Sequence, residues 1–376
     1  MVVSELFYFK EAIMELKIKT LELQEMVGKA ITGASNNVLL PITSLMNIKV
    51  ENNILVLTTT DGTNYFYVRS SEKIDCEDFE VSVIADLFTK LIQKTTSENV
   101  SLIFDNSLTV KGNGEYKIEL PLDENGELIK YPDPVSSLNL SNAVEKTINR
   151  TTIQVILDTI KPALAVTLEN PCYTGYYVGD QVVATDTYTI ASMDVKLFDE
   201  ARLVSPEFME LLSVVNSEKI TVQMTQNDIV CSTPDCIVYG KFMEGIEDYA
   251  IDAIMGLVDT EMDSFCSIPK NAILQLLDRL SLFVGTYDKN AIHLTFTPNG
   301  LQVSSKAASG VEIIDYVSSE NFKDFTCSID IQMLTQEIKA IQNDVIELCY
   351  GEDNAIKMTD GNITIIVALL EDDMAE

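Results

Sequence analysis

The sequence predicts an α+β protein of three repeated units, each with two helices packed on antiparallel β-sheets. Three observations lead to this fold class. An apolar helical stripe occurs three times along the 376 residues, a second stripe follows each first one, and an alternating strand pattern follows each second stripe. The order of elements is the same in every third of the chain, with a period of roughly 120 residues, and such agreement is improbable by chance.

The first helix of each unit is indicated by apolar residues at i, i+3, i+4, i+7 and i+11, the spacing of one buried helix face. The three stripes are Leu23, Met26, Val27, Ala30 and Ala34; Ile153, Ile156, Leu157, Ile160 and Leu164; and Ile273, Leu276, Leu277, Leu280 and Val284. Alternation then predicts strands at 54–58, 182–185 and 301–304, because successive strand side chains point to opposite faces.

The second helix of each unit carries a shorter stripe, with Glu337 as its one polar departure. Its members are Ile84, Leu87, Phe88 and Leu91; Phe208, Leu211, Leu212 and Val215; and Leu334, Glu337, Ile338 and Ile341. Alternating strands are expected next, at 100–104, 220–224 and 345–349. A turn and a further strand then complete each unit, at 107–110, 228–231 and 355–358.

Domain boundaries are expected where proline and glycine interrupt the pattern. The longest candidate linker is 123–140, with Gly126, Pro132 and Pro134, and a second junction is expected near 256–263, after an apparent loop at 244–249. The predicted organisation is an N-terminal extension at 1–15, then three domains at 16–134, 135–262 and 263–376. The last domain ends in an acidic tail at 371–376.

The composition is that of a folded protein, with 46% hydrophobic and 22% charged residues. No apolar run is long enough to span a membrane, and the N-terminal segment lacks a secretory signal pattern, so we expect a cytoplasmic protein without membrane association. The seven cysteines show no C-x-x-C spacing. Reduced, mostly buried thiols are therefore expected, and the alternative of a metal site lacks further ligands.

Catalysis has little support in the sequence. His293 is the only histidine, and alternation at 291–295 makes it an ordinary strand residue. No serine or cysteine signature accompanies it, and no phosphate- or dinucleotide-binding glycine motif is present. Paired carboxylates carry little information in a chain with 58 acidic residues. We therefore expect a protein that is not an enzyme and needs neither a cofactor nor a metal.

A net charge of −32 opposes nucleic acid binding, which needs a basic surface. Net charge, however, does not say where the charges lie. Basic residues on or beside the predicted helices are Lys29, Lys90, Lys94, Arg150, Lys161, Lys270, Arg279 and Lys339. Lys29 and Arg279 occupy the same repeat position, where the middle unit has Thr159. Taken alone, these residues fit either solvated helix faces or a surface that contacts phosphates.

The chain resembles the bacterial-type DNA sliding clamp, the beta subunit of DNA polymerase III, from about Leu16 to Leu370. The best local matches to this family, in chain order, are Leu40-Pro41-Ile42, Thr60-Asp61-Gly62, Val183-Ala184-Thr185-Asp186, Lys241-Phe242, Glu244-Gly245 and Asp248-Tyr249. The third match is similar to the family's V-A-T-D-G-H-R-L, and the last three are similar to its K-L-x-x-G-x-F-P-D-Y. Each match is weak alone, and their order within a threefold repeat gives the resemblance its specificity.

The resemblance implies a homodimeric ring of six domains, with helices lining a hole around double-stranded DNA. In such a ring the eight basic residues would be the DNA-lining set, and weak, non-specific phosphate contacts would permit sliding. The acidic exterior would repel DNA from the outer faces. The implied partners are a replicative DNA polymerase and a clamp loader. The implied function is processivity, because a tethered polymerase rebinds the primer end at high effective concentration.

The resemblance also implies a hydrophobic cleft between the second and third domains where polymerase and loader peptides dock. The positions that match its walls are Tyr173, Thr185, Thr187, Tyr188, Thr189, Ile190, Ile254, Val367 and Ala368. Plain strand packing is the alternative interpretation for each. The chain departs from the family at Thr187 and Thr189, where the family has glycine and arginine, and at 368–371, where it has M-P-[MV]-R.

Two other classes of function fit parts of the sequence. An acidic DNA-mimic or scaffold protein would use the exterior charge and leave Lys29, Lys90 and Arg279 without a role. An enzyme built on a repeated α+β unit would need a cluster of titratable groups in a pocket. The oligomeric state separates the first of these from a dimeric ring.

Overall fold

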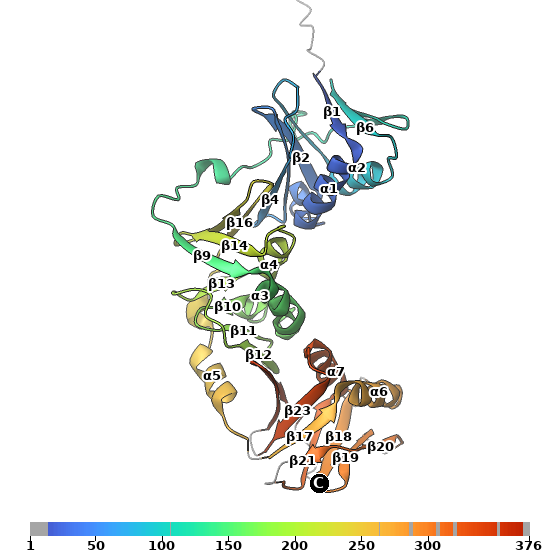
Figure 1. The fold of residues 1–376 in the computed structure, drawn as a ribbon, viewed down its shortest axis with the longest axis vertical. Helices are drawn as coiled ribbons and strands as arrows, with labels where there is room; N and C mark the ends of the chain where they lie inside the picture. The colour runs from blue at the N-terminus through green and yellow to red at the C-terminus, as the bar shows by residue number, and fades with distance from the viewer. Residues whose placement is uncertain are drawn as a thin grey trace, which may run out of the picture. The chain divides into compact units, whose positions relative to one another are not determined.

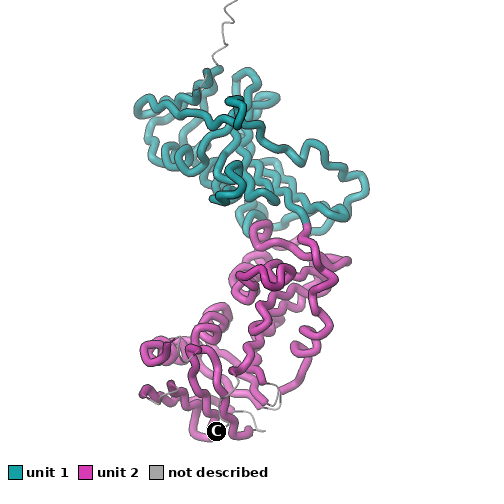
Figure 2. The backbone as a smooth tube through the Cα atoms, turned by 180° about the vertical axis from the view of Figure 1, so that it is seen from behind, with its two compact units in different colours: residues 1–147, 210–241 teal, residues 148–209, 242–376 magenta. Residues whose placement is uncertain are grey.

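The computed structural model describes residues 14–105, 107–262, 264–285, 289–305, 309–318, 322–351 and 354–370. The acidic tail and the predicted N-terminal extension up to residue 13 lie outside these residues. The chain forms two compact units (Figure 2). The first contains the residues up to Thr147 together with Glu210–Lys241, and the second contains Ile148–Met209 together with the residues from Phe242 onward.

The first unit contains two sheets and the helices α1 (Thr20–Ala30) and α2 (Ala85–Gln93), which pack on each other. The four-stranded sheet has the order β1 (Met14–Lys19), β6 (Asn99–Phe104), β7 (Leu108–Lys111), β8 (Glu115–Ile118). The eight-stranded sheet has the order β5 (Phe79–Ile84), β2 (Leu45–Glu51), β3 (Ile54–Thr60), β4 (Tyr65–Arg69), β16 (Cys236–Lys241), β15 (Asp228–Ser232), β14 (Lys219–Met224), β9 (Val144–Asn149).

The second unit is also built on two sheets. The nine-stranded sheet has the order β13 (Arg202–Val204), β10 (Tyr176–Val178), β11 (Val182–Thr185), β12 (Thr189–Met193), β25 (Ile363–Ala368), β24 (Ala355–Asp360), β23 (Val345–Tyr350), β17 (Ser264–Pro269), β21 (Val317–Ser318). The four-stranded sheet has the order β20 (Val311–Ile314), β19 (Gly300–Ser305), β18 (Ala291–Thr297), β22 (Phe325–Asp330).

Helices α6 (Lys270–Leu280) and α7 (Ile331–Ala340) pack on each other in the second unit (Figure 1). The other helices are α3 (Arg150–Val155), α4 (Pro206–Ser213) and α5 (Ile251–Asp259). Short 3₁₀ segments lie at Ile31–Gly33, Pro41–Ser44, Val135–Ser137, Lys161–Ala163, Pro171–Thr174, Ile246–Asp248 and Ser281–Phe283. No helix among the described residues is both long and apolar enough to cross a bilayer.

The threefold repeat is confirmed by the order of these elements. Each repeat begins with a strand that runs directly into a helix, as in β1–α1, β9–α3 and β17–α6, and each contains a later pair of the same kind, as in β5–α2, β13–α4 and β22–α7. The strands predicted at 100–104, 220–224 and 345–349 are β6, β14 and β23. Antiparallel sheets covered by helices thus make up the predicted α+β fold.

The first helix of each repeat buries most of its predicted stripe. Leu23 of α1 and Ile273 of α6 are fully buried, whereas Ala34 and Val284 lie beyond the helix ends. In the middle repeat, α3 changes at Ile156 into a π-helical turn (Ile156–Ile160), which places an extra residue in the turn. Leu157 is therefore only half-buried, and the prediction of a regular stripe there is wrong in this detail.

The predicted stripe of the second helix in the first repeat is shifted by one residue. Ile84 and Leu87 are 47% and 49% exposed, and the buried face consists of Ala85, Phe88, Thr89 and Ile92. Ile84 is the last residue of β5 and pairs with Leu45. The helix begins after it, so the helical phase starts at Ala85 and places Leu87 on the outer side.

Consecutive repeats are joined through continuous sheets. In the first unit β4 pairs antiparallel with β16, and in the second unit β12 pairs antiparallel with β25. Each junction therefore joins the last strand of a short meander in one repeat to a strand of a neighbouring repeat. In the third repeat β20 has the position of β4 and β12, and in the first repeat β8 has the position of β16 and β25. Neither β8 nor β20 has a neighbour on its outer side in the described part of the chain. Both are sheet edges.

The two predicted linkers have different structures. The segment 123–140 is largely irregular, and Val135 and Leu138 pack on the aromatic face of the eight-stranded sheet, where the Tyr67 hydroxyl donates to Asp133 at 3.0 Å. At 256–263 the prediction is partly wrong, because α5 continues to Asp259. Helix formation there gives this segment a role in the site described next.

Candidate functional site

The residues predicted to line a DNA channel lie on or beside the helices, at the surface. Lys90, Lys94, Arg150, Lys161, Arg279 and Lys339 are exposed, and Lys29 and Lys270 are half-buried. Lys29 is the next-to-last residue of α1, and Arg279 is the next-to-last residue of α6. The equivalence that the sequence suggested is therefore confirmed by the helix boundaries. Thr159, at the corresponding place in the middle repeat, is fully buried.

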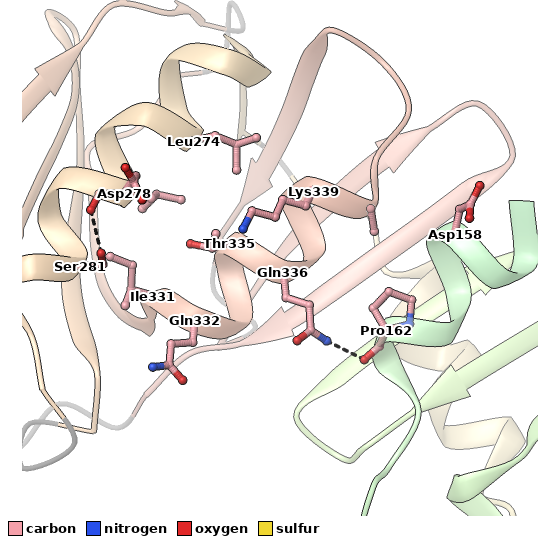
Figure 3. Close-up of a pocket in the computed structure, with 12 residues that line it drawn as sticks. Asp158, Pro162, Leu274, Asp278, Ser281, Ile331, Gln332, Thr335, Gln336 and Lys339 are labelled. Carbon is pink, nitrogen blue, oxygen red and sulfur yellow. Dashed lines mark hydrogen bonds between the residues drawn. The ribbon is translucent and has the colours of Figure 1, made fainter. Parts of the chain in front are cut away.

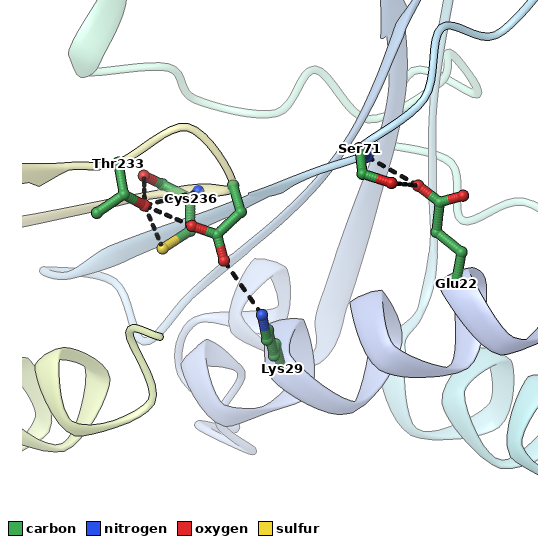
Figure 4. Close-up of polar contacts among 6 residues, drawn as sticks. Glu22, Lys29, Ser71, Thr233 and Cys236 are labelled. Carbon is green, nitrogen blue, oxygen red and sulfur yellow. Dashed lines mark hydrogen bonds and ion pairs between the residues drawn. The ribbon is translucent and has the colours of Figure 1, made fainter. Parts of the chain in front are cut away.

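Lys29, Lys90 and Arg279 are each paired with a carboxylate of the same chain. Lys29 Nζ lies 3.2 Å from Asp235 Oδ2 (Figure 4), and Lys90 Nζ lies 2.7 Å from Asp86 Oδ2. Arg279 makes a two-pronged contact, in which Nε and Nη2 donate to the two carboxylate oxygens of Glu312 at 2.8 and 2.5 Å. The sequence did not reveal these pairs, because the partner carboxylates of Lys29 and Arg279 come from other elements.

Lys270 has a structural role. Its ammonium group donates to the backbone carbonyls of Lys339, at 3.1 Å, and of Ile341, at the end of α7. A cation at the C-terminal end of a helix satisfies carbonyls that have no partner within the helix and opposes the helix dipole. Lys270 is therefore held against α7 and is less free to reach a phosphate than the prediction assumed.

A hollow of about 600 Å³ with a mixed polar and apolar lining lies between α6, α7 and the end of the middle repeat's first helix. Its charged lining residues are Asp158, Asp278 and Lys339, and Gln336 donates to the Pro162 carbonyl across it at 2.7 Å (Figure 3). Two of the three charges are acidic. This hollow therefore brings Lys339 beside carboxylates and does not form a basic pocket.

The predicted peptide cleft corresponds to a smaller, mainly apolar pocket of about 160 Å³ at the β12–β25 junction. Four of the nine predicted residues line it, namely Thr187, Tyr188, Ile190 and Ala368. Tyr188 is 65% exposed at the rim, and its backbone carbonyl accepts a hydrogen bond from the Ala368 amide at 2.8 Å. The pocket thus combines an apolar floor with an exposed aromatic edge.

Strand alternation places two predicted residues elsewhere. Ile190 pairs with Ile366 and both line the pocket, so the neighbouring pair Thr189 and Val367 points to the opposite face of the sheet. Both are buried there. Thr189 and Val367 therefore do not line this pocket.

Three further predicted residues lie near the pocket without lining it. Thr185 is buried, and its hydroxyl donates to the Thr189 carbonyl at 2.7 Å inside the turn. Ile254 is buried in an apolar cluster with Ile190 and Ile366, and Tyr173 packs against the same cluster. Tyr173 also stacks edge-on with Tyr249, with ring centroids 5.0 Å apart. These residues support the pocket floor.

The pocket also has walls that the sequence analysis missed. Leu257 of α5 and the following residues Thr260 and Met262 form one side, and Asn354, Ala355 and Ile366 complete it. Lys357 holds α5 in place, because its ammonium group donates to the carbonyls of Val258 at 2.6 Å and Thr260 at 3.0 Å. Alternation from Ala368 could have identified Ile366. Leu257, Thr260 and Met262 were missed, since the segment 256–263 was interpreted as a junction between domains.

A buried carboxyl lies close to the turn at the pocket rim. Glu337 of α7 is only 1% exposed, and its Oε2 has no hydrogen-bond partner. Burial is the main cause that raises the pKa of this carboxyl, the nearby charge of Asp186 acts in the same direction, and together they bring the pKa to about 8. Glu337, the polar departure in the helix stripe, is therefore largely protonated near neutral pH.

The residues weighed for catalysis or metal binding have ordinary structural environments. His293 lies on β18, and its Nδ1 is 2.8 Å from the Ser328 hydroxyl. All seven cysteines are free thiols, and Cys231 and Cys236 are buried on neighbouring strands. Within the described ranges, no three metal-ligating side chains come together.

Solved sliding clamps match nearly the whole chain. The DNA polymerase sliding clamp of Bacillus subtilis is 16% identical, with a TM-score of 0.81 over 96% of this chain and 99% of its own. The DNA polymerase III beta subunit of Thermotoga maritima is 15% identical, with a TM-score of 0.79 over 95% and 99%. The sliding clamp of Bartonella birtlesii, solved with griselimycin bound, is 14% identical, with a TM-score of 0.81 over 95% and 99%.

No family model and no curated protein matches the sequence. The structural likeness nevertheless extends over the full length of the solved clamps and is shared by several of them. At sequence identities of 14% to 16%, this structural likeness establishes the fold. The protein has the fold of the bacterial DNA polymerase III beta subunit.

Proposed function

We propose that this protein is a sliding clamp, a non-enzymatic processivity factor that encircles double-stranded DNA as a homodimer. In this role it holds a replicative DNA polymerase near the primer end, so that a lost contact is restored by intramolecular rebinding. Its three domains, taken as 16–134, 135–262 and 263–376, would supply half of a six-domain ring in the cytoplasm.

The observation that carries the proposal is the pair of open sheet edges. Within the chain, repeats are joined by strand pairing at β4–β16 and at β12–β25. Because the chain repeats, β20 is equivalent to β4, and β8 is equivalent to β16. However, neither β20 nor β8 has an outer neighbour among the described strands. A second copy supplies the missing partner for each, and two such junctions close a dimer.

The side chains of β20 support this role. Val311 and Ile313 are 50% and 64% exposed on an edge strand, which is an arrangement that favours pairing with another chain. On β8, Tyr116 is also exposed. Antiparallel pairing of these edges satisfies free backbone groups and covers the apolar side chains.

The proposed partners follow from the two surfaces already described. The exposed cations on the helices provide non-specific phosphate contacts, which position the protein on DNA without reading sequence. The pocket at the β12–β25 junction provides an apolar site for a short peptide of a polymerase or clamp loader, with Tyr188 at its rim. The clamp of Bartonella birtlesii was solved with griselimycin bound, which supports the view that this fold accepts ligands.

The oligomeric state tests the proposal first. Light scattering on the eluting peak of a size-exclusion column should give twice the mass of one chain at micromolar concentration, and electron microscopy should show a ring with six lobes. A stable monomer under these conditions contradicts the ring and favours the alternative of an acidic DNA-mimic or scaffold protein.

A further inference from the structure

Two basic residues at equivalent positions of the first and third repeats are each held by a carboxylate from another element. Lys29, near the end of α1, contacts Asp235 of the β15–β16 turn, and Arg279, near the end of α6, contacts Glu312 of β20. The middle repeat has the buried Thr159 at this position, so no cation is present to be held. In both repeats that have a basic residue at this position, a carboxylate lies beside that residue.

Asp235 is positioned for this contact by its own turn. The Thr233 hydroxyl donates to Asp235 Oδ1 at 2.7 Å, which leaves Oδ2 facing Lys29 (Figure 4). The Cys236 amide in turn donates to the Thr233 hydroxyl oxygen at 3.1 Å. Partial burial disfavours the charge on Asp235, but hydrogen bonds from Thr233 and Lys29 outweigh this effect and lower its pKa. The carboxylate is therefore ionised and fixed beside the lysine.

Glu312 meets Arg279 in a different geometry with the same result. The guanidinium group donates to both carboxylate oxygens, which is the strongest common arrangement of these two groups. Hydrogen bonding from Arg279 lowers the pKa of Glu312, so both groups are charged at neutral pH. Two different elements thus provide the same kind of partner.

Fold stability is a poor explanation for these pairs, because ion pairs that are open to solvent contribute little to it. The side chains of Lys29 and Asp235 are 33% and 40% exposed, and those of Arg279 and Glu312 are 55% and 32% exposed. An anion in solution can therefore reach both cations. A phosphate that approaches either one must compete with a carboxylate that is already in place.

We propose that Asp235 and Glu312 are built-in counter-charges that compete with DNA phosphates for Lys29 and Arg279 and so weaken the grip on the duplex. The proposal rests on the proposed function as a clamp. A cation neutralised by its own carboxylate displaces fewer counterions from DNA, so it adds little to affinity or to its salt dependence. Weak contacts of this kind let a ring slide while encirclement prevents its loss.

The test is the salt dependence of equilibrium binding to a short duplex, measured by fluorescence anisotropy on the full chain over a range of sodium chloride concentrations. In the double variant Asp235→Asn with Glu312→Gln, two cations per chain, and so four in the proposed dimer, are released to bind phosphate. The plot of log affinity against log salt should steepen by up to about 3.6, since each phosphate contact on B-DNA contributes about 0.9. An unchanged slope overturns the proposal.

A second pair of variants separates local release from a general change in net charge. When Lys29→Ala and Arg279→Ala are added to the double variant, the steepening should disappear. If it persists without these cations, the carboxylates act through net charge alone and the proposal is wrong. Glu72→Gln is the matched control, because it removes one carboxylate from an ion pair, Lys19–Glu72 at 2.7 Å, outside the DNA-lining set. Its slope should equal that of the wild type.

The wild-type protein decides separately whether the clamp function holds. Its retention on a duplex with both ends blocked is compared with retention on the same duplex with open ends. Loss from both overturns the clamp and the counter-charges together. Retention on blocked DNA alone, combined with an unchanged slope in the double variant, overturns only the counter-charges.

Discussion

The turn at 185–189 repeats the hydrogen bonds of the turn at 60–64. In each, the first threonine hydroxyl donates to the carbonyl four residues later, at 2.6 Å from Thr60 and 2.7 Å from Thr185. An aspartate then accepts two backbone amides. The third residue has positive φ in both, but it is Gly62 at 105° in one and Thr187 at 81° in the other. A β-branched residue in this region is strained.

This strain predicts opposite effects for a pair of exchanged substitutions. Gly62→Thr should lower the free energy of unfolding by about 1–3 kcal/mol, because it creates the strain that Thr187 already has. Thr187→Gly should change it by less than about 1 kcal/mol or raise it, because relief of strain offsets the greater freedom of glycine in the unfolded chain. Urea unfolding measures both. Equal losses in the two variants would show that Thr187 is unstrained.

The protonated Glu337 predicts a pH dependence with a definite sign. In the unfolded chain this carboxyl loses its proton near pH 4.5, whereas in the folded protein it holds the proton up to about pH 8. The folded state therefore binds more protons in this window, and stability falls as pH rises through it, by roughly 1.4 kcal/mol per pH unit at most. Below the window this group has no effect.

Glu337→Gln should remove that dependence, because glutamine fills the same space without a charge. The unfolding free energy of the variant, minus that of the wild type, should grow from pH 5 to pH 8 in urea titrations. Parallel curves across this range would mean that Glu337 is ionised in the folded protein. The sequence marked Glu337 as a departure but could not show its burial, which depends on packing between α7 and residues far away in the chain.

At the scale of elements, the edge strands β8 and β20 would form the interface of the proposed dimer. Val311→Asp with Ile313→Asp should convert the protein to a monomer, because two buried charges at the junction cost far more than exposed ones. The thermal midpoint of the monomeric variant should remain close to that of the wild type diluted until its dimer dissociates. Light scattering at matched concentration measures the change.

The control for the edge variants is Val317→Asp. Val317 is 72% exposed on β21, which is also an outer strand of its sheet but has no equivalent junction in the repeat. This variant should remain dimeric. A wild-type dimer that persists with both aspartates on β20 would place the interface elsewhere.

The pocket at the β12–β25 junction predicts a separate loss of partner binding. Tyr188→Ala with Leu257→Ala removes the rim and one wall, both exposed, and should weaken a docking peptide by about tenfold or more without unfolding the protein. Leu168→Ala is the control, because Leu168 is also an exposed apolar residue, at 78%, and does not line the pocket. Surface plasmon resonance with polymerase C-terminal peptides should distinguish them, and equal binding by all variants would exclude this pocket.

How much the sequence could predict differs between elements. The order of helices and strands followed from periodicity, because apolar spacing depends on local geometry. The choice of which α2 residues face the core could not be predicted in this way, since it depends on the position where β5 ends. Six of the ten residues that line the pocket were also missed, among them Leu257 of α5, which lies in a segment interpreted as a junction between domains. Partners such as Asp235, far from Lys29 in the chain, are fixed only by tertiary structure.

At the scale of the whole molecule, the charge distribution explains how a chain of net charge −32 can hold DNA. In the proposed clamp a few cations on the helices make the phosphate contacts, and some of them are already paired with carboxylates. Affinity is then weak, and retention depends on topology. Such a protein should stay on DNA at salt concentrations that abolish phosphate contacts, provided that it cannot leave through an end.

The most direct test is retention on DNA whose ends can be opened at will. The protein is threaded onto a linear biotinylated duplex, the ends are blocked with streptavidin, and the sample is washed at high salt. The account predicts that the protein stays on blocked DNA, leaves unblocked DNA, and is released when a restriction enzyme cuts the blocked duplex. Equal loss from blocked and unblocked DNA, or retention after cutting, would contradict encirclement.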